Sequence, residues 1–162
     1  MAQNAYLTVA GQKQGQITGG VTIKGREGNI EVHAFSETVL SPRDASTGLP
    51  TGKRQHTPVM IVKAIDRSSP LLLNALVNNE NLTTWVLKFF GNDASGKVLQ
   101  IYSITLTNAS IASITQSLPD TSIAANASLP LREEITFTYQ KIQWTWMDGA
   151  ITAQDDWQAP VT

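Results

Sequence analysis

The sequence predicts a mainly β protein, with barrel-like antiparallel sheets and one short flanking α-helix at about residues 69–79. Three observations lead to this prediction. Apolar and polar residues alternate over several runs, as they do in strands with one buried face. Only one segment combines helical spacing with start and stop signals. No set of catalytic groups accompanies this arrangement, which favours a structural or binding protein over an enzyme.

The strand predictions rest on side-chain parity. Apolar residues take alternate positions in four runs: Trp85, Leu87 and Phe89; Tyr102, Ile104 and Leu106; Ile135, Phe137 and Tyr139; and Ile142, Trp144 and Trp146. The parity changes at about Lys141, which predicts a β-bulge or a strand buried on both faces in turn. Shorter strand candidates lie at 6–9, 16–23, 31–40, 58–65 and 110–115.

The helix prediction is local. Ser69 is the expected N-cap, and Pro70 suits the first helical turn. Asn78 and Asn79 supply a C-terminal stop. The helix core is expected to consist of three residues on one face: Leu72, Leu73 and Leu76. A helix this short is not stable alone, so it should dock on a sheet.

Two long irregular stretches, 41–55 and 119–130, interrupt the predicted strands. Connections of this length inside a compact domain are usually functional or disordered. The first is rich in Gly and Pro and carries three basic side chains against one acidic one. Its candidate functional residues are Arg43, Asp44, Lys53, Arg54, Gln55 and the adjacent His56.

Composition narrows the possible functions. The chain has 162 residues, which fits one domain over 1–162. Its net charge is −1 and only 15% of its residues are charged, which argues against nucleic-acid binding because phosphates require clustered Lys and Arg. Cysteine is absent, which excludes thiol catalysis and disulfides. We expect no membrane insertion and no cleaved signal peptide, since no apolar run is long enough.

Searches for catalytic, metal and cofactor sites give weak candidates. The glycine-rich string at 48–54 resembles a phosphate-binding loop, but its glycines are one residue too close and Arg54 replaces the required Ser or Thr. Neither His33 nor His56 has a neighbouring cluster of metal ligands. Asp155 and Asp156 are adjacent and would point apart on a strand, so they are expected to be solvated or ion-paired. We therefore expect no metal and no cofactor.

The positions of the tryptophans leave a second function open, that of a carbohydrate-binding module. Three of the four tryptophans lie near the C-terminus: Trp144, Trp146 and Trp157. Exposed indoles would suit a monomeric β-barrel carbohydrate-binding module. Core and interface anchoring is the commoner use of tryptophan, and we favour it.

The sequence also resembles the hemolysin-coregulated protein (Hcp) family of bacterial type VI secretion. The similar segments run in order along the chain: AYL at 5–7, GQKQG at 11–15, ITGG at 17–20, TGLPTGKRQHTP at 47–58, PLLLNAL at 70–76, NASI at 108–111, YQKIQW at 139–144 and DDW at 155–157. A departure lies at 26–31, where many relatives have a longer insertion. The last segment makes Asp155, Asp156 and Trp157 candidates for a tail contact.

The resemblance implies a tube protein. Family members have a domain related to phage tail tubes, form hexameric rings, and stack these rings into a tube. A contractile sheath propels the tube and its spike protein from the cytoplasm into a neighbouring cell, and some members carry effector proteins in the lumen. For this chain it implies self-association, partners among the spike, sheath and effectors, and secretion without a cleaved signal. It also implies that the 41–55 loop contacts a neighbouring ring, for which Asp155 or Asp156 could supply acidic partners.

Overall fold

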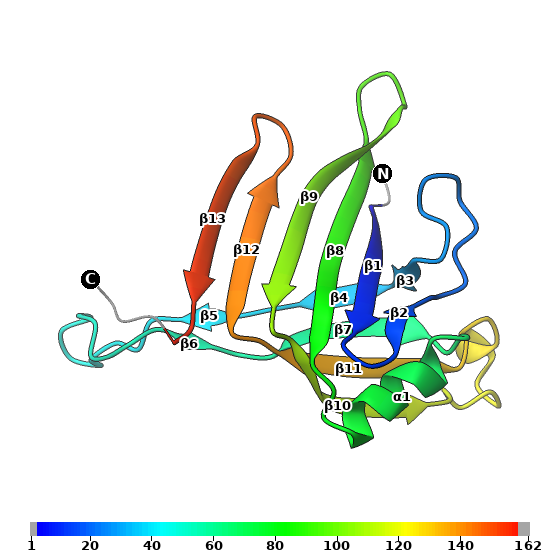
Figure 1. Ribbon diagram of the computed structural model, residues 1–162, viewed down its shortest axis with the longest axis horizontal. Coiled ribbons are helices and arrows are strands. Elements are labelled where there is room, and N and C mark those ends of the chain that lie inside the picture. Colours follow the sequence, from blue (N-terminus) through cyan, green and yellow to red (C-terminus); the bar gives the residue numbers. More distant parts are fainter. Residues whose placement is uncertain (1–2, 159–162) are drawn as a thin grey trace.

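A seven-stranded antiparallel sheet forms the larger layer of the computed structural model, which describes residues 3–158 (Figure 1). Its strand order is β13–β12–β9–β8–β1–β2, and β3 also pairs with β1. The strands are β1 (Asn4–Gly11), β2 (Gly15–Ile17), β3 (Ile30–Val32), β8 (Leu82–Asn92), β9 (Val98–Thr107), β12 (Lys141–Trp146) and β13 (Ile151–Asp156).

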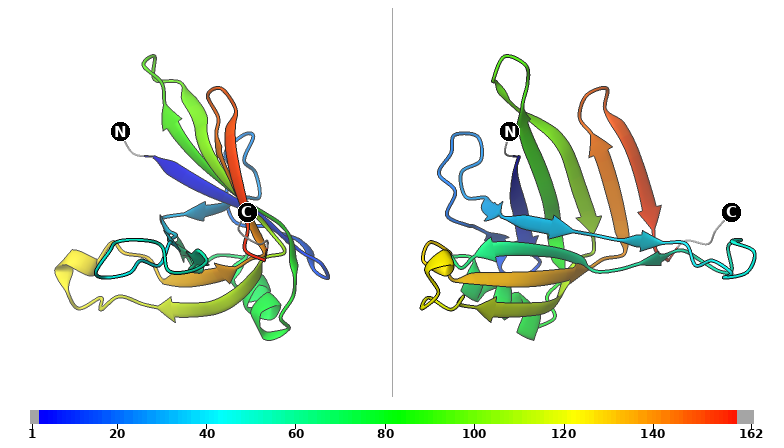
Figure 2. Two further views of the ribbon diagram at one scale, coloured as in Figure 1. Left: turned by 90° about the vertical axis from the view of Figure 1, so that its left-hand side faces the viewer. Right: turned by 180° about the vertical axis from the view of Figure 1, so that it is seen from behind.

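A second, four-stranded sheet lies across the first, and its strands run at a steep angle to those of the larger sheet (Figures 1 and 2). Its order is β10–β11–β7–β4. The remaining elements are β4 (Ala34–Ser36), β5 (Val39–Leu40), β6 (Gln55–His56), β7 (Val59–Ala64), α1 (Ser69–Val77), β10 (Ser110–Ser117), the short 3₁₀ helix η1 (Ala124–Asn126) and β11 (Arg132–Thr138). The predicted fold class, barrel-like antiparallel sheets with one flanking α-helix, is confirmed.

The core lies between the two sheets and follows the predicted alternation. Trp85 and Leu87 of β8 and Ile135 and Phe137 of β11 are all fully buried. The rings of Trp85 and Phe137 meet edge-on, with centroids 5.3 Å apart, which is a favoured geometry for aromatic pairs. The alternate residues of the larger sheet point to its outer face and are mostly polar.

The parity change near Lys141 has a different cause from the predicted bulge. The chain leaves the four-stranded sheet at Thr138 and enters the seven-stranded sheet at Lys141. Tyr139 and Gln140 make this crossing, so the side that faces the core reverses with the change of sheet. The bulge prediction was therefore wrong, because alternation reports burial and does not report which sheet a strand joins.

Two other strand predictions were too long. The 16–23 candidate is a strand only over Gly15–Ile17. The 31–40 candidate divides into β3, β4 and β5, and these three short strands belong to three different sheets. Each short strand forms hydrogen bonds with one neighbouring strand: β3 with β1, β4 with β7, and β5 with β6. Through these three strands the chain passes from the larger sheet to the 41–55 loop.

Helix α1 lies against the four-stranded sheet close to β10 (Figure 1). Its N-cap is Ser68, so the prediction of Ser69 was wrong by one residue. The helix ends at Val77, and Asn79 adopts a left-handed φ of 49°, as asparagine often does after a helix. Leu72 and Ala75 are buried, whereas Leu73 and Leu76 are half-buried.

A buried ion pair lies beneath the start of α1. The side chains of Lys63 on β7 and Glu133 on β11 are both fully buried, and Lys63 Nζ contacts Glu133 Oε1. The Ser69 hydroxyl donates to Glu133 Oε1 at 2.8 Å, and Lys63 Nζ also contacts Asp66 Oδ1 at 3.2 Å. Because each charge has several partners, the desolvation of the pair is compensated.

Within residues 3–158, no helix is long and apolar enough to cross a membrane.

Candidate functional site

The 41–55 loop projects from the body of the molecule beyond β13, close to the end of that strand (Figure 1). We call residues 41–55 the arm. Its base is the two-stranded ladder of β5 and β6, in which Val39 pairs with His56 and Leu40 with Gln55. An isolated bridge between Arg43 and Pro50 holds its two sides together further out.

Asp44 organises the tip of the arm. Its Oδ1 accepts hydrogen bonds from the backbone N–H groups of Ser46 and Thr47 at 2.9 and 2.8 Å and from the Ser46 hydroxyl at 2.6 Å. These bonds, led by the one from the Ser46 hydroxyl, lower the pKa of Asp44 to about 2. Gly48 follows with φ of 72°, a left-handed conformation that glycine adopts without strain. The tip of the arm therefore has a defined conformation that its own hydrogen bonds hold.

At its root the arm is tied to the C-terminal strand. Arg54 Nε and Nη2 donate to the two carboxylate oxygens of Asp155 at 2.7 and 2.8 Å, which is the strong bidentate arrangement. Nη2 also donates to the Asp156 carbonyl at 2.6 Å. The Arg54 hydrogen bond is the main cause that lowers the pKa of Asp155, so this carboxylate stays charged.

His56 completes this contact. Its buried ring lies 2.6 Å from Asp155 through Nε2 and 2.9 Å from the Tyr139 hydroxyl through Nδ1. Trp157 covers the other side, with its ring centroid 5.5 Å from that of His56. We call Arg54, His56, Tyr139, Asp155 and Trp157 the clasp. It joins β6, the crossing between the two sheets, and the end of β13.

Asp156 holds the tail in a second way. Its Oδ2 accepts a hydrogen bond from Gln140 Nε2 at 3.2 Å, and the Trp157 N–H donates to the Gln140 carbonyl at 2.8 Å. Asp155 is therefore bound to Arg54 and His56 of its own chain. The pairing of the loop's basic residues with Asp155 or Asp156 of a neighbouring ring stays a prediction, and within one molecule Arg54 already binds Asp155.

The other predicted arm residues lie apart from the clasp. Arg43, Lys53 and Gln55 are exposed, whereas Asp44 is partly buried by the turn that it organises. Sequence reasoning missed the role of Tyr139, which was interpreted only as a core strand residue. It also missed the hydrogen bond from Trp144 Nε1 to Glu37 Oε1 at 2.6 Å. No local pattern indicates either contact, because the partners are 83 and 107 residues apart.

The clasp has the chemistry of a structural contact. A His–Asp pair acts in catalysis when a nucleophilic hydroxyl or thiol faces the second ring nitrogen. Here that position holds the Tyr139 hydroxyl, whose pKa is raised by burial and by nearby Glu37 and Asp155. Among residues 3–158, no group of three His, Asp or Glu side chains could hold a metal ion.

Comparison with known proteins decides the family. Residues 6–146 match the family described as "Type VI secretion system effector, Hcp". The chain belongs to the Hcp family. The match covers α1, the arm and every strand except β13 and the first residues of β1, and the family resemblance of the sequence is confirmed.

Named relatives agree with this assignment. The "Major exported protein" of Pseudomonas aeruginosa PAO1 is 36% identical over 170 residues, which cover 99% of each chain. The solved structure of Hcp1 from Escherichia coli EAEC 042 is 31% identical, with a TM-score of 0.85 over 96% of this chain and 99% of that one. Hcp3 of Pseudomonas aeruginosa is 30% identical, with a TM-score of 0.79 over 98% of this chain and 100% of that one.

The tryptophans of this Hcp protein give little support to the carbohydrate-binding alternative. Trp85 lies in the core, Trp144 donates to Glu37, and Trp157 packs on His56. Trp146 is the most exposed of the four, at 48%. A stacking platform for sugars needs several exposed rings on one surface, whereas three of these four rings make contacts within the protein.

Proposed function

We propose that this Hcp protein is a structural subunit of a type VI secretion tube. Copies join edge to edge into a closed ring, a hexamer, and the rings stack. The observation that carries the proposal is the pair of open edges of the seven-stranded sheet. Among residues 3–158, strand β13 pairs only with β12 at one edge, and β2 and β3 form the other edge beside β1.

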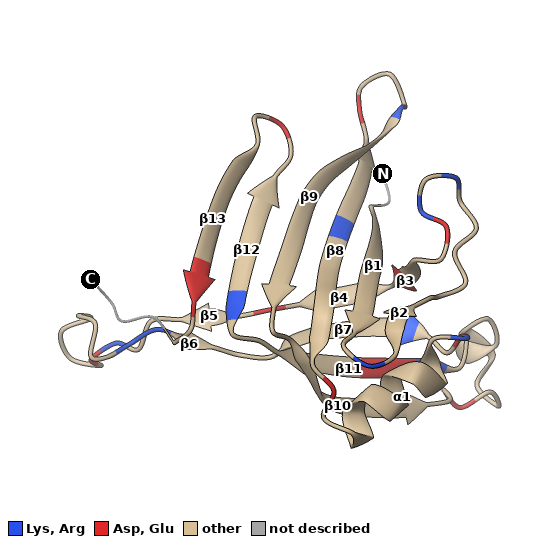
Figure 3. Ribbon diagram, in the orientation of Figure 1, with Lys and Arg blue, Asp and Glu red and all other residues tan. Residues whose placement is uncertain are grey.

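Open edges expose unpaired backbone groups, which pair readily with another strand. Two different edges on one molecule give a head-to-tail contact, and such a contact closes into a ring when the rotation per copy allows it. Charge does not oppose this pairing, because few charged residues lie on the sheet (Figure 3). The arm extends beyond the β13 edge and would lie beside the next copies.

The outer face of this sheet suits the lining of a lumen. Register places one row of side chains across five neighbouring strands: Thr8, Val86, Thr105, Gln143 and Gln154. This row is uncharged, and its polar groups can be hydrated. We propose that this face lines the central channel, where effector proteins are carried during export, and that spike and sheath proteins are the other partners of the tube.

Export follows from this role. The relative named "Major exported protein" supports passage out of the cell. We propose that this passage runs through type VI secretion, after assembly in the cytoplasm and without a cleaved signal peptide. We propose no catalytic activity for this chain.

The test is the native mass of the purified protein. Sedimentation or native mass spectrometry at micromolar concentration should give six times the 17.6 kDa of one chain. Substituting Pro for Thr152 or Gln154 on β13 should reduce the ring population, since proline removes a backbone donor at the edge. Proline in the exposed turn residue Ala94, which lies away from both edges, is the matched control. A monomer at all concentrations would contradict the proposal.

A further inference from the structure

A pair of aromatic side chains lies on the outer face of the seven-stranded sheet. Tyr6 of β1 points to this face, between the core residues Ala5 and Leu7, yet it is only 3% exposed. Its ring meets that of Phe90 on β8 edge-on, with centroids 5.6 Å apart. A ring on the outer face can be buried this far only if another segment covers it.

The cover is Arg26, from the loop that joins β2 to β3. Its guanidinium carbon lies 4.4 Å from the centre of the Phe90 ring and 5.1 Å from that of Tyr6. A guanidinium stacked on aromatic rings keeps its N–H edge available for hydrogen bonds. The backbone is held as well: the Arg26 N–H donates to the Ile23 carbonyl at 2.9 Å, and the Arg26 carbonyl accepts from the Asn29 N–H at 3.1 Å. Arg26 is therefore in place before any partner binds.

A second cation lies beside this stack. Lys88 of β8 is directly opposite Tyr6 in the β1–β8 ladder, so the two side chains share the outer face. Among residues 3–158, neither Arg26 nor Lys88 makes an ion pair. We call Arg26, Lys88, Tyr6 and Phe90 the basic cluster. Two neighbouring cations without a counter-ion suit an anion, and a guanidinium can donate two parallel N–H bonds to a carboxylate.

Two acidic side chains border the basic cluster without neutralising it. Glu27 is bound to its own loop, where its Oε2 accepts a hydrogen bond from the Gly25 N–H at 2.9 Å. Glu31 of β3 lies opposite Tyr6 on the side away from β8, and it is exposed to solvent. Lys24 adds a further cation to the same loop. Positive charge is therefore in excess here, although the whole chain has a net charge of −1.

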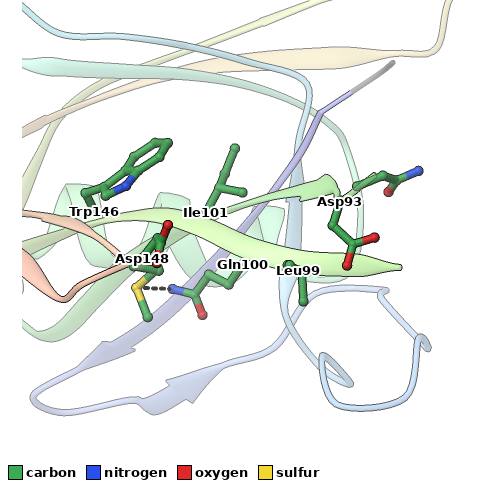
Figure 4. Close-up of a pocket in the computed structure, with 8 residues that line it drawn as sticks. Asp93, Leu99, Gln100, Ile101, Trp146 and Asp148 are labelled. Atoms are coloured by element: carbon green, nitrogen blue, oxygen red, sulfur yellow. Dashed lines mark hydrogen bonds between the residues drawn. The ribbon is translucent and has the colours of Figure 1, made fainter. Parts of the chain in front are cut away.

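The free ends of two hairpins of the same sheet carry the opposite charge. A hollow of about 550 Å³ lies there, between the turn that joins β8 to β9 and the turn that joins β12 to β13 (Figure 4). Leu99 and Trp146 belong to its apolar lining, and the carboxylates of Asp93 and Asp148 border it. Hydrogen bonds, led by the one from the Ser95 hydroxyl, lower the pKa of Asp93 and keep it charged. An anionic partner is therefore disfavoured at the hollow and favoured at the basic cluster.

We propose that the basic cluster binds carboxylates of an acidic segment of another protein. One carboxylate accepts the paired N–H groups of Arg26, a second lies beside Lys88, and an apolar group between them packs against Phe90. Nucleic acid is the less suitable occupant, because a phosphate backbone requires more cations than these.

The consequence for export rests on the proposed tube function, in which this face lines the channel. A closed ring repeats the basic cluster in every copy, and rings of like charge select what enters a channel by its charge. Several weak contacts then act on one acidic chain at once. The cluster therefore favours acidic proteins among those that the tube carries.

The test measures binding of a fluorescein-labelled peptide of Glu-Leu-Glu-Ser repeats by anisotropy, with the same peptide carrying Gln in place of Glu as the neutral control. The natural chain should bind the acidic peptide and not the neutral one. Arg26→Gln and Lys88→Gln should each raise the Kd about tenfold, since each removes a charged hydrogen bond. Lys97→Gln removes the same charge from the exposed β8–β9 turn and should leave the Kd unchanged, as should Asp148→Asn at the hollow.

Native mass and thermal unfolding, measured on each variant, show that the fold is kept. If Arg26→Gln disturbs the loop, Lys88→Gln on β8 still tests the site. Equal Kd values for the natural chain and the Arg26→Gln and Lys88→Gln variants would overturn the inference, and tighter binding of oligothymidylate than of the acidic peptide would assign the cluster to phosphate instead. Rings that bind no acidic peptide would overturn it and leave the proposed function intact. Binding by a chain that stays monomeric would support the site, which lies within one copy, and reject the tube function.

Discussion

The Lys63–Glu133 pair beneath α1 and the Arg54–Asp155 pair at the root of the arm have similar chemistry but different surroundings. The first is fully excluded from solvent, and its charges are shared with Ser69 and Asp66. In the second pair the Arg54 and Asp155 side chains remain 18% and 28% exposed. An ion pair that water can reach opens at little cost, whereas a buried pair cannot open without leaving a charge unsolvated. The first therefore ties β7 and β11, two neighbouring strands of the four-stranded sheet, to the start of α1, and the second can release the arm and tail.

The largest expected effect tests the buried pair. Lys63→Met leaves Glu133 charged and buried without its cation, and should lower the free energy of unfolding by about 3–5 kcal/mol. The double variant Lys63→Met, Glu133→Leu should recover most of this loss, since it removes both charges. Denaturant titration at fixed protein concentration measures both. If Lys63→Met lowered the free energy of unfolding by less than the double variant did, the stability contributions of Lys63 and Glu133 would not depend on each other.

The next prediction concerns the helix above this pair. Leu72→Ala removes a fully buried side chain and should lower the free energy of unfolding by about 2–5 kcal/mol. Leu76→Ala, on the same helix but half-buried, should cost less than half as much. Equal losses in the same titration would show that α1 packs through a different face.

A smaller effect is expected in the clasp. His56→Phe keeps a ring against Trp157 but leaves the buried Tyr139 hydroxyl without its partner, which should cost about 1–3 kcal/mol. Hydrogen exchange should rise mainly in the arm and β13, while β7 and β11 remain protected. Uniform loss of protection over all four segments would mean that the clasp and the core unfold together.

The smallest effect is a response to pH. The pKa of Asp155 is lowered by Arg54, so its contribution to stability is complete above the ordinary Asp value of about 3.9 and is lost as pH falls through the lowered value. We expect Trp157 fluorescence to change below about pH 4. Trp157→Phe identifies the signal, and Asp155→Asn should abolish the transition. A transition that persists unchanged in Asp155→Asn would assign it to another carboxylate, such as Asp44.

Local signals predicted the elements whose causes are local. Pro70 and the Leu72 spacing located α1, and the alternation at Trp85 and Leu87 identified β8 and its buried face. The sheet change at Tyr139 could not be predicted, because a period of two residues is the same in either sheet. The contacts of the clasp could not be predicted from the sequence either, because they join side chains about a hundred residues apart, such as Arg54 and Asp155.

The long separation of these residues in the sequence also explains why their identities were predicted but their contacts were not. The sequence places Arg54, His56 and Asp155 among the candidates, but it does not indicate that they contact one another within one chain. An ion pair between two chains and an ion pair within one chain use the same residue types, so the sequence does not distinguish them. The hollow was not predicted at all, because Asp93, Leu99 and Trp146 lie on separate hairpins that only the sheet brings together.

The clasp also sets an order of events during protein synthesis. Arg54 leaves the ribosome 101 residues before its partner Asp155. At about 5–20 residues per second, these residues take about 5–20 s to be made. Throughout this interval the root of the arm lacks the strand that fixes it. A nascent chain therefore lacks the clasp until β13 has been translated, and the arm is held before then only by the contacts within residues 39–56.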